Sequence, residues 1–271
     1  MSAERVALDG VARTMLMTLW FRALDARSAH PILGDAWAPD VVDRIDADWS
    51  LAEWGRGNAP VIAERGRRLD RWTQDFLDAH PDAQVLHLGC GLDSRPLRVR
   101  RPPTSRWIDV DQGEVVDLRR RLYDLPDDVE VVAGSVTDTG WWGTVDGGRP
   151  TLVVAEGLLM YLPADEVRAL VDRVVDRLAS GELLYDGVAG WLVPCMRLSA
   201  LVPSWGSVRF AWAQEDLGRR RPGVRTVEDV AVLDLLAADP AAGSLRRTAY
   251  ALGALVPPLR SALRLHRVRF G

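Results

Sequence analysis

The stretch VLHLGCGLDSRPLRV, residues 85–99, carries two glycines one residue apart directly after an apolar run. Glycine has no Cβ, so this spacing allows another group to approach the main chain closely. A dinucleotide-binding turn would carry a third glycine three residues after the second, where this chain has Ser94. Taken alone, Gly89 and Gly91 therefore indicate either a ligand-binding turn or only a tight turn between a strand and a helix.

An acidic residue follows at a spacing that suits a ribose. Asp111 ends the apolar run RWIDVD, twenty residues after Gly91. A carboxylate at the end of that second strand can accept hydrogen bonds from two ribose hydroxyls, although it can equally bind turn amides. All 34 basic residues are arginines, so a P-loop lysine and a lysine Schiff base are excluded. A glycine turn that a ligand can approach closely and a carboxylate that can bind a ribose together indicate a nucleoside ligand. Because such a ligand needs no phosphate site, S-adenosylmethionine is favoured.

Composition bounds the class of protein. The chain has 271 residues, 48% of them hydrophobic, and a formal net charge of -4, which offers no basic surface for nucleic acid. Two cysteines cannot build a disulfide framework, and no metal-ligand spacing such as H-x-x-x-H occurs. No signal peptide is visible, and no apolar run reaches the roughly 18 residues of a membrane span. We expect a cytoplasmic protein without metal, nucleic-acid or membrane partners; the oligomeric state cannot be predicted.

The elements that must position these residues alternate along the chain. Apolar residues at helical spacing predict helices over residues 11–28 and 61–80. Helical segments then separate short apolar runs, which lie at residues 84–89, 106–111, 129–134, 151–157 and 181–187. Strands that alternate with helices predict a parallel sheet covered on both faces, with ligands bound at the carboxyl ends of the strands. The alternating end RLHRVRFG predicts a final strand.

The regular alternation lapses after Gly190, where a segment rich in tryptophan shows neither pattern clearly. Such a segment is typical of an insertion or lid over the acceptor site. We therefore expect a single domain over residues 1–271, which divides into a helical N-terminal cap (1–80), a cofactor-binding core (81–190), an acceptor lid (191–240) and closing C-terminal elements (241–271).

Three stretches carry a resemblance to a known family. VLHLGCGLDSRPLRV, WIDVDQGEVVDLRRRLY and PTLVVAEGLLMYL, at these separations, resemble the leucine carboxyl methyltransferase family. The nearest likeness is to its bacterial branch of polyketide O-methyltransferases, the tetracenomycin carboxyl methyltransferase type. The N-terminal stretch TLWFRALDARSAHPILGDAWA extends the likeness to roughly residues 14–190. The resemblance implies a class I methyltransferase fold: an α/β Rossmann-like sheet, mostly parallel with an antiparallel C-terminal strand, with N-terminal helices and a lid insertion.

The resemblance also implies roles for five residues at the cofactor. Gly89 and Gly91 would let the main chain approach the methionyl part of S-adenosylmethionine, and Asp111 would hold the ribose hydroxyls. Arg65 matches an arginine near the methionyl carboxylate, and Arg22 matches a basic residue at the same end. A solvated helix face is the alternative for both arginines.

Three further positions complete the implied cofactor site. Glu156, after the fourth strand, would face the methionyl ammonium or the reacting groups. A buried glutamate is costly unless it is paired, so a ligand or an arginine should lie beside it. Ser135 and Val136 stand where the family commonly has Asp-Leu or Asp-Val against the adenine. The shorter, neutral serine predicts a weaker contact there, and Asp138 could replace it only by a local shift.

The acceptor would lie beyond the fourth strand. Tyr161 is the one candidate near the reacting groups, and no catalytic residue is assigned. The residues predicted to bind the acceptor are Tyr161, Trp191, Arg197, Trp205 and Arg209, with Phe210 and Trp212 as further members of an aromatic wall. These aromatic residues could equally form the small core of the lid itself. We expect Cys90 to be a small buried filler, and Asp93 and Arg95 to form an ion pair in the turn.

The implied activity is O-methylation of a small-molecule secondary metabolite. A carboxylate acceptor is ionised at neutral pH and needs no general base, whereas a phenol benefits from one. The sequence places no histidine beside a carboxylate, and His87 lies inside a strand as a core residue would. A carboxylate acceptor is therefore favoured. The alternatives are methylation of a hydroxyl group, methylation of a protein C-terminus, and a non-methylating cyclase or binding protein of the same fold.

Overall fold

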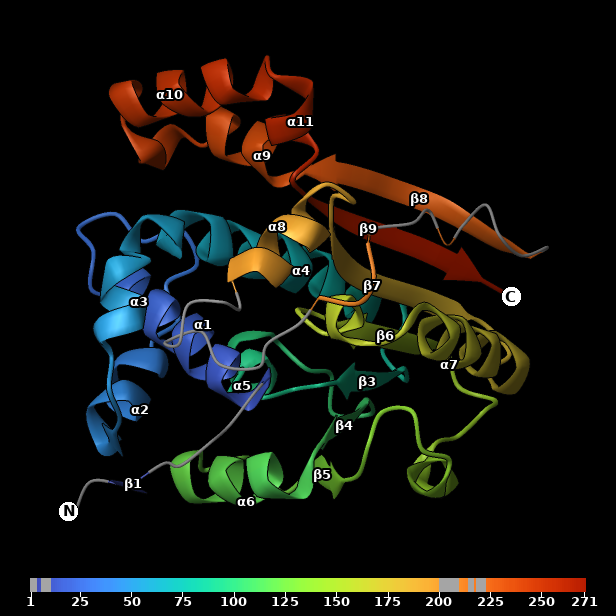
Figure 1. Ribbon diagram of the computed structural model, residues 1–271. Coiled ribbons are helices and arrows are strands. Elements are labelled where there is room, and N and C mark those ends of the chain that lie inside the picture. The colour runs from blue at the N-terminus through green and yellow to red at the C-terminus, as the bar shows by residue number, and fades with distance from the viewer. Residues whose placement is uncertain (1–3, 6–10, 200–209, 214–216, 218–222) are drawn as a thin grey trace.

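The computed structural model describes residues 4–5, 11–199, 210–213, 217 and 223–271 (Figure 1). These residues form a seven-stranded sheet in the order β5-β4-β3-β6-β7-β9-β8 and a minor two-stranded pair, β1-β2. The first five strands of the large sheet run parallel, and β9 is antiparallel to both of its neighbours. The predicted class I methyltransferase fold is confirmed. The strands are β1 (Glu4–Arg5), β2 (Ile45–Asp46), β3 (Gln84–Leu88), β4 (Arg106–Asp111), β5 (Val129–Ala133), β6 (Thr151–Ala155), β7 (Gly181–Val188), β8 (Val224–Ala231) and β9 (Leu263–Phe270).

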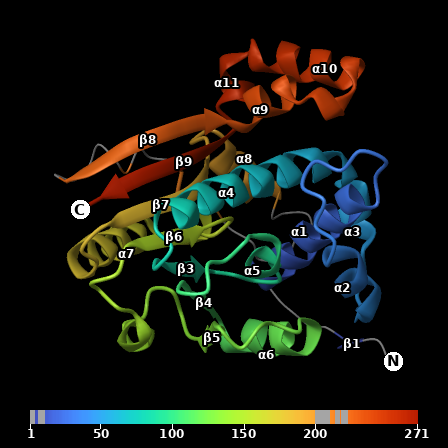
Figure 2. The same cartoon turned by 180° about the vertical axis from the view of Figure 1, so that it is seen from behind.

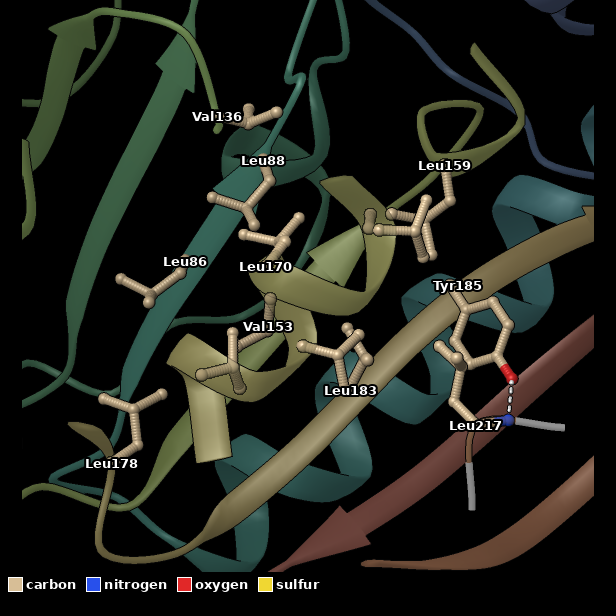
Figure 3. Packing of buried hydrophobic residues seen from close by; sticks show 14 of the residues in the cluster. Leu86, Leu88, Val136, Val153, Leu159, Leu170, Leu178, Leu183, Tyr185 and Leu217 are labelled. Carbon is tan, nitrogen blue, oxygen red and sulfur yellow. Dashed lines mark hydrogen bonds between the residues drawn. The ribbon is translucent and has the colours of Figure 1, made fainter. Parts of the chain in front are cut away.

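Helices cover both faces of this sheet because its central strands are apolar on both sides. All five residues of β3 are buried, and neighbouring residues of a strand point to opposite faces. Leu86 packs with Val153 of β6 and Leu183 of β7 against Leu170 of α7 (Figure 3). Val85 faces the other way, into a cluster with α4, which runs along that face in Figure 2. The helices of the two faces are α4 (Ala59–Ala79), α5 (Arg95–Arg98), α6 (Gly113–Leu122) and α7 (Ala164–Arg177).

The N-terminal helices bring side chains over the carboxyl ends of the strands. Leu16 and Leu19 of α1 share a buried cluster with Leu92 of the glycine turn and Leu118 of α6. This packing fixes α1 above the turn between β3 and α5. The predicted helices at residues 11–28 and 61–80 are confirmed, with ends shifted by one or two residues. The N-terminal helices are α1 (Val11–Ala26), α2 (Ala38–Arg44) and α3 (Ser50–Trp54).

Part of the segment predicted as a lid belongs to the sheet. Residues 224–231, inside the 191–240 segment, form the edge strand β8, which pairs with β9. Its sequence VRTVEDVA lacks a continuous apolar run because an edge strand buries little of its surface, and a register shift between Thr226 and Glu228 interrupts the period of two. The C-terminal helices gather beside this edge of the sheet (Figures 1 and 2). They are α9 (Val232–Ala238), α10 (Ser244–Ala254) and α11 (Pro257–Arg260), whereas α8 (Leu192–Ser199) follows β7 and is separate from this group.

Short 3-10 turns lie at Arg56–Asn58, Gly140–Thr144, Leu159–Tyr161 and Pro240–Ala242. Among the residues described, no helix combines the length and the apolar character that crossing a membrane requires. The division of the chain into one domain with four parts stays a prediction.

Candidate functional site

A cavity of about 430 Å³ lies at the carboxyl ends of β3, β4 and β6, with α1 beside it. Crevices at this edge of a parallel α/β sheet are where ligands bind in such folds. Helix α1 contributes Thr14, Met15, Thr18 and Leu19 to its wall. The cavity also brings together every residue predicted to bind the cofactor, namely Arg22, Arg65, Gly89, Gly91, Asp111, Ser135, Val136 and Glu156.

The glycine turn requires glycine at both positions. Gly89 has φ of 62° and Gly91 has φ of 51°, which is the left-handed region that residues with a Cβ rarely adopt. A Cβ on Gly89 would lie 2.9 Å from Leu158 Cδ1, and one on Gly91 would lie 3.1 Å from Met15 Cγ. The backbone conformation therefore disfavours a residue with a Cβ at both positions, and at Gly89 such a residue would also require Leu158 to move.

Asp111 binds the turn and faces the cavity as well. Its Oδ2 accepts a hydrogen bond of 2.7 Å from the Gly91 amide, and its Oδ1 accepts one of 2.7 Å from the Gln112 amide. Burial raises the pKa of Asp111, and these two hydrogen bonds oppose the rise. Because each oxygen accepts one bond here, lone pairs are left for a ligand. The two roles considered for this residue are thus compatible.

A buried arginine binds the main-chain carbonyls of the same turn. Arg119 of α6 donates from Nη1 to the carbonyl of Gly91 (3.1 Å) and to that of Asp93 (2.7 Å). Its Nε and Nη2 donate to Oδ2 of Asp109 on β4, at 2.9 and 2.6 Å. Both side chains are fully buried. The pair therefore fixes the carbonyl side of the turn, while Asp111 fixes its amide side.

His87 is buried, as predicted, but it has a carboxylate partner that the sequence did not indicate. Its Nδ1 lies 3.1 Å from Asp109 Oδ1, and Arg95 Nη1 lies 3.4 Å from its Nε2. The two residues meet because His87 and Asp109 are paired across β3 and β4. This cross-strand register could not be derived from either run alone.

Glu156 is the centre of a buried ionic cluster. Arg22 Nη2 and Arg65 Nε donate to its Oε1 at 2.9 and 3.0 Å, and Arg95 Nη2 donates to its Oε2 at 2.5 Å. Burial alone would raise the pKa of Glu156, but the three guanidinium groups hold it well below its ordinary value. The expected arginine partner of this glutamate is thus present three times.

The arginines of this cluster are not on a solvated helix face. Arg22 is 3% exposed and Arg65 is 7% exposed. Arg22 also pairs with Asp93 at 2.8 Å, and the predicted ion pair of Asp93 with Arg95 is confirmed at 3.0 Å. The solvated alternative is therefore wrong for both Arg22 and Arg65.

Sequence reasoning missed Asp186. This fully buried residue of β7 accepts from Arg65 Nη1 at 3.0 Å and from the Gly157 amide at 2.6 Å. Burial raises its pKa, and the charge of Arg65 opposes that rise. An acidic residue inside the apolar run GELLYDG was the available signal, because a buried carboxylate needs a cationic or hydrogen-bonding partner.

The two residues predicted at the adenine lie at the cavity wall. Ser135 Oγ is 2.9 Å from Thr137 Oγ1 and accepts the Thr137 amide at 3.3 Å, while Val136 is buried. The serine hydroxyl is thus already engaged within its own loop. Asp138, considered as a substitute, is not among the described residues that line the cavity.

Tyr161 lines the cavity at the side of the predicted acceptor. Its hydroxyl donates to Thr14 Oγ1 at 3.2 Å, and its ring stacks on Phe210 with centroids 5.2 Å apart. Burial raises the pKa of its hydroxyl above the ordinary value of 10.0. Tyr161 is therefore protonated near neutral pH and can donate a hydrogen bond.

Within the described part of the chain, none of the other predicted acceptor residues lines the cavity. Trp191 is 41% exposed, and Trp212 is buried beside Tyr185 in the core of the sheet, so Trp212 is not part of an aromatic wall. The side chain of Arg197 and the whole of Trp205 and Arg209 lie outside the described residues. Cys90 is a buried filler, as predicted, at 2% exposure.

Comparison with known proteins agrees with this geometry. The leucine carboxyl methyltransferase family matches residues 15–175. Tetracenomycin polyketide synthesis O-methyltransferase TcmP of Streptomyces glaucescens is 40% identical over 273 residues, which cover 98% of this chain and 99% of that protein. S-adenosyl-L-methionine-dependent methyltransferase dpfgK of Gibberella zeae is 32% identical over 84% of this chain and 85% of that protein.

A solved structure supports the fold alone. A Thermobifida fusca protein named as a methyltransferase superposes with a TM-score of 0.61 at 21% identity, covering 92% of this chain and 94% of that one.

Proposed function

The chain belongs to the leucine carboxyl methyltransferase family and is an S-adenosylmethionine-dependent methyltransferase, and from that premise we propose that it methylates a carboxylate of an aromatic, polyketide-like small molecule. The activity is that of the family. The acceptor and the roles of individual residues are the proposal. TcmP, named for tetracenomycin polyketide synthesis, supports the substrate class because the similarity spans both chains almost entirely.

One observation carries the assignment of the cofactor site: a single cavity joins two chemically different ends. Asp111 ends β4, whereas Glu156, which binds Arg65, follows β6, two strands further along the sheet. Two strand spacings amount to roughly 10 Å. An elongated ligand with ribose hydroxyls at one end and an amino-acid carboxylate at the other fits such a cavity. When bound there, S-adenosylmethionine supplies a methyl group made electrophilic by its sulfonium.

We assign the protein groups along that cavity accordingly. Asp111 accepts hydrogen bonds from the ribose hydroxyls, and the glycine turn allows the main chain to approach the thioether region. Arg65 binds the methionyl carboxylate, because its Nε and Nη1 are taken by Glu156 and Asp186 and its Nη2 has no hydrogen-bond partner among the described residues. Arg22 adds positive charge at the same end. Oε2 of Glu156 accepts one bond here, from Arg95, and keeps a lone pair for the methionyl ammonium.

A carboxylate acceptor is favoured by the state of the nearby groups. Tyr161 keeps its proton because burial raises the pKa of its hydroxyl, and both nitrogens of His87 face groups of the buried network. Neither side chain is therefore poised to take a proton from a phenol. A carboxylate needs no such base, so alignment and exclusion of water suffice for an in-line displacement.

Methyl transfer to paired acceptors tests the proposal. The purified protein is incubated with S-adenosylmethionine and a panel of aromatic carboxylic acids, each matched with a phenol on the same ring system, and methyl esters and methyl ethers are identified by mass spectrometry. We expect methyl esters, at a rate that is flat between about pH 6 and 9 because a carboxyl group with a pKa near 4 is ionised throughout. Methyl ethers alone, at a rate that climbs toward the phenol pKa, would overturn the carboxylate assignment.

A binding measurement separates the cofactor from the acceptor. Calorimetry with S-adenosylmethionine and S-adenosylhomocysteine should detect both ligands. If neither binds, the cofactor site is wrong, whatever the acceptor panel returns.

A further inference from the structure

Asp186 links two parts of the cavity wall without being a lining residue itself. It is fully buried in β7 and uses one oxygen for each partner. Oδ2 accepts from Arg65 Nη1 at 3.0 Å, and Oδ1 accepts from the amide of Gly157 at 2.6 Å. Both partners lie at the cavity, where Gly157 follows Glu156 after β6. Register explains the contact, because Ala155 of β6 pairs with Tyr185 of β7 directly before these residues.

Two acidic residues together fix the plane of the Arg65 guanidinium. Nε donates to Glu156, which follows β6, and Nη1 donates to Asp186 of the neighbouring strand β7. A guanidinium is planar, so two bonds to separate, buried carboxylates leave it no freedom to rotate. Its Nη2 is then directed to one place, 3.5 Å from where a Cβ on Gly157 would be. Gly157 has φ of 61° and leaves that space open.

We propose that Asp186 is a positioning residue, which orients Arg65 so that the guanidinium meets the carboxylate at the amino-acid end of the cofactor. The proposal rests on the proposed role of Arg65. Asp186 touches neither the ligand nor the reacting atoms. It acts by holding Arg65 in the orientation that the ligand requires, and the same carboxylate shapes the turn at Gly157.

A buried ion pair is a poor choice if stability is its only purpose. Removing two charges from water is costly, and well-packed apolar side chains often stabilise a protein as much. The Asp186–Arg65 pair instead leaves one arm of the guanidinium for a further anion. A group that must bind a carboxylate gains affinity when it is held in the bound orientation beforehand.

Two ligands distinguish positioning from a general structural role. S-adenosylhomocysteine carries the amino-acid carboxylate, whereas 5′-methylthioadenosine keeps the nucleoside and the thioether but lacks the amino-acid part. The ratio of their dissociation constants therefore reports on the carboxylate contact alone. A variant that loosens the whole cavity weakens both ligands and leaves the ratio unchanged.

The test variant is Asp186→Asn, with Glu182→Gln as the matched control. Asparagine can still accept from the Gly157 amide, but it loses the charge that binds Arg65. Glu182 is also a buried carboxylate of β7 bound to two arginines, Arg267 and Arg269, each at 2.6 Å, but it is not among the residues that line the cavity. We expect Asp186→Asn to weaken S-adenosylhomocysteine roughly tenfold or more and 5′-methylthioadenosine by less than about twofold, because only the former uses Arg65. Glu182→Gln should leave the ratio unchanged.

Equal weakening of both ligands by Asp186→Asn, or an unchanged affinity for S-adenosylhomocysteine, overturns the proposal. Arg65→Met separates this failure from failure of the Arg65 assignment. If Arg65→Met changes the ratio and Asp186→Asn does not, Arg65 binds the carboxylate without help from Asp186. If Arg65→Met leaves the ratio unchanged, the assignment of Arg65 is itself wrong. Should Asp186→Asn not fold, Asp186→Glu keeps the charge but displaces it, and a smaller loss confined to S-adenosylhomocysteine supports the proposal, whereas an equal loss for both ligands overturns it.

Discussion

The amide of Gly91 donates a hydrogen bond of 2.7 Å to Oδ2 of Asp111, which ends the strand beside it. The carbonyl of the same glycine accepts from Arg119 at 3.1 Å. Side chains therefore bind both the amide and the carbonyl of Gly91. The glycine turn and the carboxylate of Asp111 form one rigid unit. A ligand that contacts either part meets a surface already set for the other, which lowers the entropy lost on binding.

Loss of the Asp111 carboxylate should affect every ligand that contains a ribose. We expect Asp111→Ala to weaken S-adenosylmethionine and S-adenosylhomocysteine roughly tenfold or more, because bonds to two hydroxyls are lost. Isothermal titration calorimetry measures both. Asp117→Ala is the control, since Asp117 is exposed on the neighbouring helix α6. Unchanged affinity in Asp111→Ala would remove this residue from the site.

Replacement of Gly89 should harm both folding and binding. Alanine at φ of 62° costs about 1–2 kcal/mol in backbone energy, and its Cβ would meet Leu158 at 2.9 Å. We expect Gly89→Ala to lower the free energy of unfolding in urea by at least that amount and to weaken S-adenosylmethionine. Gly140→Ala is the control, because no atom lies within 4 Å of its added Cβ and its φ is not positive. If the two variants are equally stable, the turn does not require glycine.

The sequence predicted the sheet well where burial leaves a simple pattern. Strands such as β3 and β6, buried on both faces, appear as continuous apolar runs, and their predicted positions were confirmed within one or two residues. The strand β8 was missed because it lies at the edge of the sheet and contains a register shift, so its residues follow neither a continuous nor a strictly alternating pattern. The conformation of β8 depends on its pairing with β9, a strand more than 30 residues further along the chain, so the residues of β8 alone do not reveal it.

The site was predictable in its members and not in their pairing. Motif spacing indicated Gly91 and Asp111, the family resemblance added Glu156, and all three line one cavity. The three arginines on Glu156 and the contact of Asp186 with Arg65 depend on which strands are neighbours and on their register. These contacts join residues up to 134 positions apart. The sequence indicates that such buried acidic residues need partners, but it does not identify the partners.

Replacement of Arg119, which binds the carbonyls of the glycine turn, should strongly lower the free energy of unfolding. Arg119→Met leaves the buried charge of Asp109 without its main partner, and breaking a buried pair in this way costs about 3–5 kcal/mol. Urea unfolding measures the loss. Arg120→Met is the control from the same helix, since Arg120 is exposed and its one hydrogen bond within the described part of the chain goes to the carbonyl of Val131 at 2.9 Å. Equal stability of the two variants would show that the Asp109–Arg119 pair adds nothing.

Acid should reveal the charge of Glu156. The folded protein holds the pKa of this carboxyl well below its ordinary value of 4.5, so its contribution to stability is complete above about pH 4.5 and is lost as the pH falls toward the folded pKa. Glu156→Gln lacks that contribution at every pH. We expect the difference in unfolding free energy between wild type and Glu156→Gln to be largest near neutral pH and to shrink below about pH 4.5. A difference that is constant from neutral pH down to about pH 3 would contradict the ion-pair assignment.

Tyr161 should serve the acceptor through its ring more than through its hydroxyl. The ring stacks on Phe210 and forms part of the cavity wall. The hydroxyl donates its hydrogen bond to Thr14 Oγ1 at 3.2 Å. Tyr161→Phe keeps the ring, so we expect kcat/KM for the acceptor to change by less than about threefold, within the range of one neutral hydrogen bond. Tyr161→Ala removes the wall and should raise the KM for the acceptor roughly tenfold, while S-adenosylhomocysteine binds within about twofold of wild type. Steady-state kinetics and calorimetry together check both. A large fall in kcat for Tyr161→Phe, with KM and cofactor affinity unchanged, would instead make the hydroxyl part of the chemistry.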